Sequence, residues 1–254
     1  MGGQATSMPD PPASMHESPT PSEPDPRQSL LRFVSEAAHE LVGPLNQVAS
    51  LVALLVNRYR GQLDDDAQDL LTHIESAAAR ASGTANSLRT YFRILGSEAQ
   101  LVPVRPTEAL DSAVDALQQE IEKSGAQISC DSLPDVQADT HLLTLLFHGI
   151  IQNSLKFRRI DTAPQIVVSA EVPPQPTPAL VRFSVIDNGI GIDPSFHEAV
   201  FNPFTKLNGH AYAGEGMGLT VARAITEVLK GRIWVGGSIS EGTRVFFELP
   251  AAAV

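Results

Sequence analysis

Apolar residues recur every three or four positions along two long stretches of the chain, a spacing that places them on one face of an α-helix. In the first stretch, from Ser29, they are Leu30, Val34, Ala37, Leu41, Leu45, Val48, Val52 and Leu55. In the second, which ends at Leu95, they are Leu70, Ile74, Ala77, Ala81, Ala85, Leu88, Phe92 and Leu95. The polar segment 61–66 (GQLDDD) separates the two. The pattern predicts a helical hairpin.

A two-helix hairpin cannot enclose a core around its own two apolar faces. We therefore expect a second copy of the chain to supply two more helices, which gives a dimeric four-helix bundle. The hairpin occupies residues 28–97. Residues 1–27 precede it and combine many prolines with Ser, Thr and acidic residues, a composition that predicts a disordered tail.

Helical and strand patterns intermix from residue 101 to 254, which we interpret as a second folded domain. The predicted helices are 106–124, 140–157 and 218–230, and the predicted strands are 127–130, 166–172, 180–186, 232–236 and 243–249. They do not alternate as in a doubly wound parallel sheet. We predict an α+β protein in which helices cover one face of a mixed sheet, an α/β sandwich.

Composition narrows the class of protein. The 254 residues carry 18 Lys and Arg against 29 Asp and Glu, a formal net charge of -11, which argues against a nucleic-acid partner. The single cysteine, Cys130, cannot form an internal disulfide. No unbroken run reaches the roughly 18 apolar residues of a membrane span, and no signal peptide is recognisable. We expect a cytoplasmic protein without membrane insertion.

His39 lies two residues from both Ala37 and Leu41, about 200° around the helix from each, so it faces away from the apolar side. A neutral imidazole is a nucleophile once another group takes its second proton, and Glu40 is the nearest carboxylate in the sequence. A solvent-facing histidine on a helix is, however, most often an ordinary surface residue.

Asn153 and Lys156 stand three residues apart near the end of a predicted helix, so they share a face. An amide oxygen is a hard ligand that suits Mg²⁺, and a lysine can neutralise phosphate. The alternative is a helix C-terminus at which cations favour the helix dipole.

Asp187 ends a predicted strand and is followed by Gly189 and Gly191. The Asp-Asn-Gly sequence is a typical hairpin turn. It also suits a carboxylate that accepts a hydrogen bond from the exocyclic amine of a purine, with glycines that let the backbone approach the ligand.

Gly214, Gly216 and Gly218 open the last predicted helix. Glycines that expose backbone amides at a helix N-terminus form an anion site. The dinucleotide-binding alternative fails because no buried strand precedes these glycines and their spacing is not GxGxxG.

The order of these motifs is more specific than any one of them. HELVGPL, QNSLKFR, DNGIGI, FNPFTKL, GEGMGL, GRIWV and EGTRVFFELP follow one another between residues 29 and 250. In this order the chain resembles a two-component sensor histidine kinase, and the second motif resembles the phytochrome-type branch. The resemblance implies that the hairpin is the dimerisation and histidine phosphotransfer domain. It implies an ATP-binding domain of the gyrase, chaperone and histidine kinase type (the GHKL or Bergerat fold) for residues 101–254.

The same resemblance implies a role for each motif residue. His39 corresponds to the phospho-accepting histidine and Glu40 to the acidic residue that assists it. Asn153 corresponds to the Mg²⁺ ligand and Lys156 to a phosphate contact, and Asp187 corresponds to the adenine-binding aspartate. The other implied nucleotide-site residues are Gly189, Gly191, Gly214, Gly216 and Gly218 in two glycine boxes, Lys206 in a flexible lid with Phe201 and Phe204, and Thr243 near the adenine.

The function expected from this resemblance is that of an ATP-dependent protein-histidine kinase. It would phosphorylate His39 from ATP and Mg²⁺ and pass the phosphoryl group to an aspartate in the receiver domain of a response regulator. The alternative is an ATP-binding docking protein or pseudokinase of the same fold. Two positions favour it, because Gly149 stands where many members have Asn and Gly43 stands where many have Thr or Asn. A serine kinase of the anti-sigma type shares the ATP-binding fold but gives no reason for the hairpin.

Overall fold

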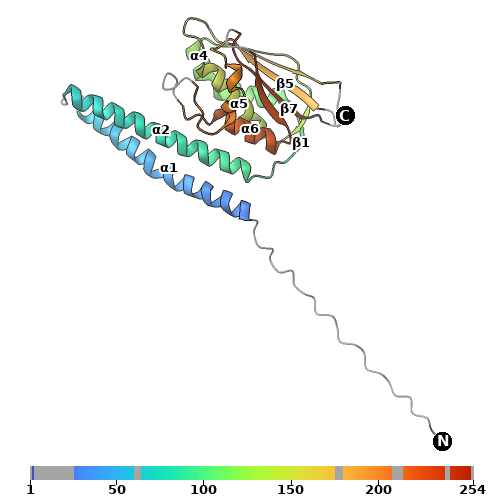
Figure 1. The fold of residues 1–254 in the computed structure, drawn as a ribbon, viewed down its shortest axis with the longest axis horizontal. Coiled ribbons are helices and arrows are strands. Elements are labelled where there is room, and N and C mark those ends of the chain that lie inside the picture. The colour runs from blue at the N-terminus through green and yellow to red at the C-terminus, as the bar shows by residue number, and fades with distance from the viewer. Residues whose placement is uncertain are drawn as a thin grey trace.

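The computed structural model describes Gly2 and residues 26–59, 64–174, 180–207, 214–237 and 241–252. They form a long helical hairpin beside a compact part built of helices and strands (Figure 1). This confirms the predicted α+β architecture. Most of the predicted tail lies outside the described residues, but its last two positions, Pro26 and Arg27, belong to the first helix, so that helix begins earlier than predicted.

The hairpin consists of α1 (Pro26–Tyr59) and α2 (Asp65–Leu95), which pack against each other along their length. Asp64 starts α2, because its Oδ1 atom accepts a hydrogen bond from the Ala67 backbone N–H at 2.8 Å. Asp65 and Asp66 then add favourable charge in the first turn of the helix.

The apolar side of α1 divides into two parts in the single chain. Leu45 and Val52 are half-buried, whereas Leu41, Val48, Leu51 and Leu55 are exposed. We call the latter four the exposed strip. The segment His39–Tyr59 is also long and apolar enough to cross a membrane by length and composition alone, with a mean hydropathy of 1.3. Polar residues such as Asn46 and Gln47 interrupt it, which is why no unbroken apolar run marks it in the sequence.

A five-stranded mixed sheet organises the second part, with strand order β2-β4-β5-β7-β6. Its strands are β2 (Gln127–Cys130), β4 (Gln165–Glu171), β5 (Leu180–Asp187), β6 (Arg232–Gly236) and β7 (Arg244–Pro250). Only the β2–β4 pair is parallel. A separate antiparallel pair, β1 (Val102–Val104) with β3 (Val136–Ala138), was not predicted because both strands are only three residues long.

Helices α3 (Pro106–Ala116), α5 (Thr140–Lys156) and α6 (Gly218–Val228) cover one face of the sheet. Between them, Phe147, Phe183 and Phe247 are fully buried and their rings are in mutual contact. The predicted helix 106–124 is in fact two helices, since α4 (Gln118–Ser124) starts after a break at Leu117. Two short 3₁₀ helices, Pro194–Phe196 and Ala199–Phe201, follow β5.

The two parts are joined by more than a linker. Ile94, near the end of α2, is 3% exposed and belongs to the same hydrophobic core as the sheet. Further along the hairpin α2 packs against α6, and Figure 1 shows α2 lying between α1 and the sheet-containing part. Gly83 is a point of close approach, because a side chain there would collide with the carboxylate of Glu215. The hairpin therefore rests against the segment that leads into α6.

Candidate functional site

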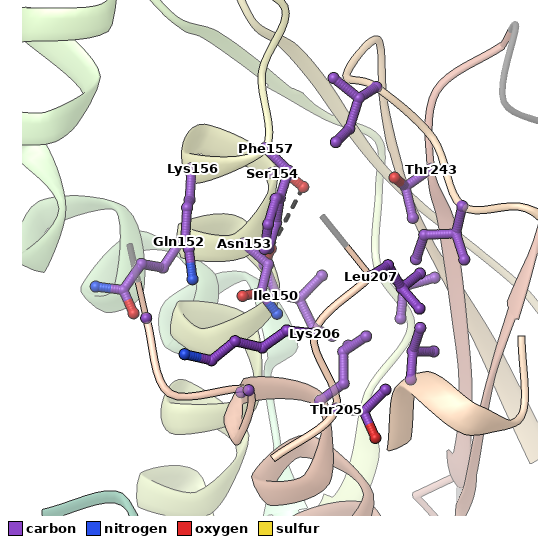
Figure 2. A pocket seen from close by; sticks show the side chains of 18 of the residues that line it. Ile150, Gln152, Asn153, Ser154, Lys156, Phe157, Thr205, Lys206, Leu207 and Thr243 are labelled. Carbon is purple, nitrogen blue, oxygen red and sulfur yellow. Dashed lines mark hydrogen bonds between the residues drawn. The ribbon is translucent and has the colours of Figure 1, made fainter. Parts of the chain in front are cut away.

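A cavity lies between α5, the ends of β5 and β7, and the segment before α6 (Figure 2). Its lining includes most of the predicted nucleotide-site residues: Asn153, Lys156, Asp187, Gly191, Lys206, Gly214, Gly216, Gly218 and Thr243. Gly189 is not among the lining residues. His39 and Glu40 lie apart from the cavity, on α1.

The carboxylate of Asp187 accepts three hydrogen bonds at one end of the cavity. Oδ1 accepts hydrogen bonds from the backbone N–H groups of Gly189 at 2.9 Å and Thr243 at 3.0 Å, and Oδ2 accepts one from the Ser154 hydroxyl at 2.8 Å. Oδ2 accepts no other hydrogen bond within the described residues. A carboxylate oxygen can accept more than one donor, so Oδ2 retains a lone pair for a ligand.

Two glycines make this arrangement of Asp187 possible. A side chain at Gly189 would collide with the Phe157 carbonyl and with Oδ1 of Asp187, and one at Gly242, whose φ is +88°, would collide with the Asp187 carbonyl. Gly189 therefore supports the carboxylate instead of lining the cavity. The hairpin alternative for this motif is wrong, because no strand that pairs with β5 follows directly and Asn188 binds Gln165 and Ala163 instead.

Positive charge gathers at the opposite end of the cavity. Figure 2 shows Lys206 extending across it toward α5, where Lys156 lies, and Thr243 on the far wall. Burial lowers the pKa of Lys156 below its ordinary value; nearby Glu215 raises it and Lys206 lowers it further. A half-buried ammonium beside a second cation is stabilised by an anion, so this end suits phosphate groups.

The segment before α6 closes this end of the cavity. Gly214 has a φ of +136° and a side chain there would collide with the ammonium of Lys156, while a side chain at Gly218 would crowd the amide of Asn153 at 3.1 Å. The first backbone N–H groups of α6 are free of helical partners and favour an anion.

One feature of the cavity fits a magnesium ion, namely the amide oxygen of Asn153. Within the described ranges no three His, Cys, Asp or Glu side chains cluster as a metal site. The Asn153 amide, between Lys156 and the start of α6, is a hard oxygen ligand at the phosphate end, where the Glu215 carboxylate also lines the cavity. Mg²⁺ retains waters and binds substrate phosphates, so one protein ligand is a workable set.

Of the two phenylalanines in the predicted lid, one is exposed and the other is buried. Phe204 is 50% exposed and has a positive φ of 63°, as expected of a strained surface turn. Phe201, however, is 2% exposed and packs under the guanidinium of Arg223, so it is a core residue. Of the lid positions, Lys206 lines the cavity and residues 208–213 lie outside the described ranges.

His39 is exposed on α1, as predicted, but its polar neighbour was not predicted. The Nη1 atom of Arg89, on α2, lies 3.4 Å from Nδ1 of His39. Glu40 is exposed, and no hydrogen bond joins it to His39 among the described side chains. The expected Glu40–His39 pairing is therefore not formed in this arrangement.

Sequence reasoning missed Ser154, Gly242 and Arg89. Ser154 lies within the QNSLKFR motif, but only the position of β5 shows that its hydroxyl faces Asp187. Gly242 requires knowledge of where β7 begins. Arg89 had no usable signal in the sequence: His39 lies 20 residues before the end of α1 at Tyr59 and Arg89 lies 24 residues after the start of α2 at Asp65, so counting from the turn does not pair them.

Comparison with known proteins agrees with this geometry. Residues 138–253 match the family described as histidine kinase-, DNA gyrase B- and HSP90-like ATPase. Cyanobacterial phytochrome A of Nostoc sp. is 39% identical over 225 residues, which are 87% of this chain and 28% of the relative. Phytochrome-like protein Cph1 of Synechocystis sp. is 37% identical over 222 residues, 87% of this chain and 29% of the relative. The chain thus spans less than a third of the length of these relatives.

Solved structures agree in fold. The full-length structure of ShkA in complex with AMPPNP has a TM-score of 0.64 at 23% identity and covers 88% of this chain and 47% of that one. The structure of histidine kinase ThkA in complex with response regulator protein TrrA has a TM-score of 0.58 at 18% identity and covers 89% of this chain and 64% of that one. Both the hairpin and the sheet-containing part are therefore within the shared fold.

The close approach of Gly242 to Asp187 can be tested by a pair of substitutions. We expect Gly242→Ala to lower the melting temperature by about 3 to 10 °C, because alanine combines an unfavourable φ with a collision against the Asp187 carbonyl. Gly149→Ala is the control, since Gly149 lies in α5 with open space around it and alanine favours a helix. Calorimetry should show a loss for the first and no loss for the second; equal melting temperatures would contradict the assignment.

Proposed function

Since the chain belongs to the two-component sensor histidine kinases and is similar to the phytochrome-like branch, we propose that it phosphorylates His39 from ATP and passes the phosphoryl group to an aspartate of a response regulator. The observation that carries this proposal is the pairing of an exposed histidine on a helical hairpin with a cavity that has a carboxylate at one end and cations at the other. Both belong to one chain, and the hairpin contacts the edge of the cavity.

The chain's residues suggest one orientation for the nucleotide. The free lone pair of Asp187 Oδ2 suits the exocyclic amine of adenine, with Thr243 on the same side. Lys156, Lys206 and the start of α6 would then contact the phosphates, and Asn153 would hold Mg²⁺, which when bound neutralises charge on the phosphates.

In the first transfer, the nitrogen lone pair of His39 attacks the γ-phosphorus. An N–P bond forms, the bond from the γ-phosphorus to the bridging oxygen breaks, and ADP leaves with that electron pair. The second ring nitrogen loses its proton, and Glu40, next in sequence, is the proposed acceptor. The cavity cations would spread the charge that develops on the phosphoryl oxygens.

This step needs movement of the hairpin relative to the cavity. Gly83, which touches Glu215, and Arg89, which touches His39, are six residues apart on α2. At a rise of 1.5 Å and a turn of 100° per residue, that separation is about 9 Å along the helix and about 120° around it. The contact of α2 with Glu215 and its contact with His39 therefore lie on different sides of the helix, and His39 does not line the cavity.

The second transfer would deliver the phosphoryl group to a partner. The exposure of His39 on α1 leaves the ring accessible to a docking protein. The ThkA structure, whose fold this chain shares, contains a response regulator, which supports the same class of partner here. In this step the N–P bond breaks, its electron pair returns to the ring, and an aspartate oxygen forms the new bond to phosphorus.

The direct test is incubation with radiolabelled ATP and Mg²⁺. We expect wild-type protein to acquire acid-labile, base-stable label and His39→Gln to lose it, because the imidazole is the proposed nucleophile. His73→Gln is the matched control, since His73 is an exposed histidine on α2. Label that persists in His39→Gln would reject His39, and bound ATP without any label would favour the docking-protein alternative.

We also propose that a second copy of the chain covers the exposed strip of α1. Leu41, Val48, Leu51 and Leu55 lie on one side of the helix and are each at least two-fifths exposed, and Leu70 on α2 is exposed as well. Covering such a strip gains about 25 cal/mol for each Å² of apolar surface removed from water. A symmetric four-helix bundle would bury the strip without a membrane.

Leu51→Glu should dissociate that dimer, because it places a charge in the middle of the exposed strip. Ser50→Glu is its control: the neighbouring position is exposed but about 100° around the helix. Light scattering after gel filtration, without detergent, should give a dimeric mass for wild type and Ser50→Glu and a monomeric mass for Leu51→Glu. A monomeric wild type, or one soluble only in detergent, would overturn the dimer.

A further inference from the structure

The guanidinium of Arg89 lies beside His39 on the hairpin. Its Nη1 atom lies 3.4 Å from Nδ1 of His39, and its Nε atom is buried without a hydrogen-bond partner among the described residues. No described carboxylate forms an ion pair with it, although arginine forms such pairs readily. Within the described ranges, the guanidinium of Arg89 therefore stands beside the proposed phosphoacceptor without an ion-pair partner.

The direction of this contact limits the protonation state of His39. A guanidinium only donates hydrogen bonds, so Nδ1 must be the acceptor, and in a neutral ring the single proton is then on Nε2. For Nε2 to attack phosphorus, the proton must instead be on Nδ1, and two donors would then face each other. The contact with Arg89 must therefore open before His39 reacts.

The phosphorylated ring, in contrast, suits the contact. Nε2 is the ring nitrogen that Arg89 leaves open, so it is the nitrogen that would take the phosphoryl group. Once Nε2 is bonded to phosphorus, Nδ1 carries a lone pair and no proton, and it can accept the N–H of Arg89 again. The negative phosphoryl oxygens on the same ring add a second attraction for the guanidinium.

Loss of the phosphoryl group to water depends on that same nitrogen. Water oxygen bonds to phosphorus, the N–P bond breaks and its electron pair returns to Nε2. A proton on Nδ1 makes this departure easier, because the ring then leaves as neutral imidazole instead of an anion. A guanidinium at Nδ1 occupies the lone pair and repels the incoming proton.

We propose that Arg89 protects phosphorylated His39 against hydrolysis by occupying Nδ1. The proposal rests on His39 being the phosphoacceptor. The contact of Arg89 is with Nδ1, and Nδ1 is the ring nitrogen that must stay unprotonated while the protein holds the phosphoryl group for its partner.

Other charged groups lie near His39 and Arg89 on the two helices. Glu36 and Glu40 flank His39 on α1, and Arg93 follows Arg89 by one turn on α2. Arg93 is exposed and its side chain has the same charge, so Arg93→Gln is a matched control for loss of one positive charge at this end of the hairpin.

The test follows the lifetime of the phosphorylated histidine in the full chain without a regulator. Wild type, Arg89→Gln, Arg89→Lys and Arg93→Gln are labelled in parallel with ATP and with phosphoramidate, which phosphorylates histidine without the nucleotide site. His39→Gln supplies the background of the other histidines. Excess donor is removed, the label is followed between pH 5 and 9, and circular dichroism checks that each variant is folded.

We expect Arg89→Gln to lose label about three- to tenfold faster than wild type at pH 7, as for the loss of one charge-assisted hydrogen bond at an exposed site. Its acid-promoted loss should begin at a higher pH, because Nδ1 is no longer shielded. Arg89→Lys should keep part of the protection and Arg93→Gln all of it.

Equal lifetimes for wild type and Arg89→Gln across the pH range would overturn the proposal, as would an equal effect of Arg93→Gln. If Arg89→Gln does not fold, the comparison of Arg89→Lys with wild type decides, since an equal lifetime and pH profile would then remove any special role of the guanidinium. Failure of ATP to label any variant would reject the proposed kinase activity, while the phosphoramidate arm would still decide the role of Arg89.

Discussion

The hydrogen bonds of one carboxylate hold the candidate site together. Asp187 ends β5, and its side chain binds the hydroxyl of Ser154 on α5 and the backbone N–H groups of Gly189 and Thr243. Three donors thus converge on a single group, and two of them, Ser154 and Thr243, also line the cavity. Because two of the donors are backbone groups, the carboxylate has one orientation, with Oδ2 open to a ligand.

The cations and the hairpin lie at the end of the cavity opposite Asp187. Lys156 follows Ser154 on α5 by two residues, so the helix that anchors Asp187 also carries the cation at the other end of the cavity. Gly83 lets α2 approach the carboxylate of Glu215 closely, which brings the hairpin to the phosphate end. Nδ1 of His39 lies 3.4 Å from Nη1 of Arg89, and the proposed transfer to His39 would require this contact to open.

Sequence patterns predicted those parts that depend on local spacing. The three- and four-residue repeat in 29–95 predicted both long helices, and five of the strand segments were found within two residues of their ends. The cavity residues were assigned through the resemblance of ordered motifs, and most of them do line one cavity. Ser154, Gly242 and Arg89 escaped because their roles depend on contacts across the fold, and Phe201 was misassigned because its burial under Arg223 is a tertiary contact.

If Asp187 accepts a hydrogen bond from the amine of a purine, the affinity of the unmodified protein must depend on that amine. The most direct measurement compares its affinities for two nucleotides. In inosine triphosphate the 6-amine donor of ATP is replaced by a carbonyl acceptor, and N1 changes from an acceptor to an N–H donor. Calorimetric titration with Mg²⁺ should give at least about tenfold tighter binding of ATP, because the carbonyl would face the Asp187 carboxylate without a hydrogen bond. Equal affinities for the two nucleotides would contradict the account.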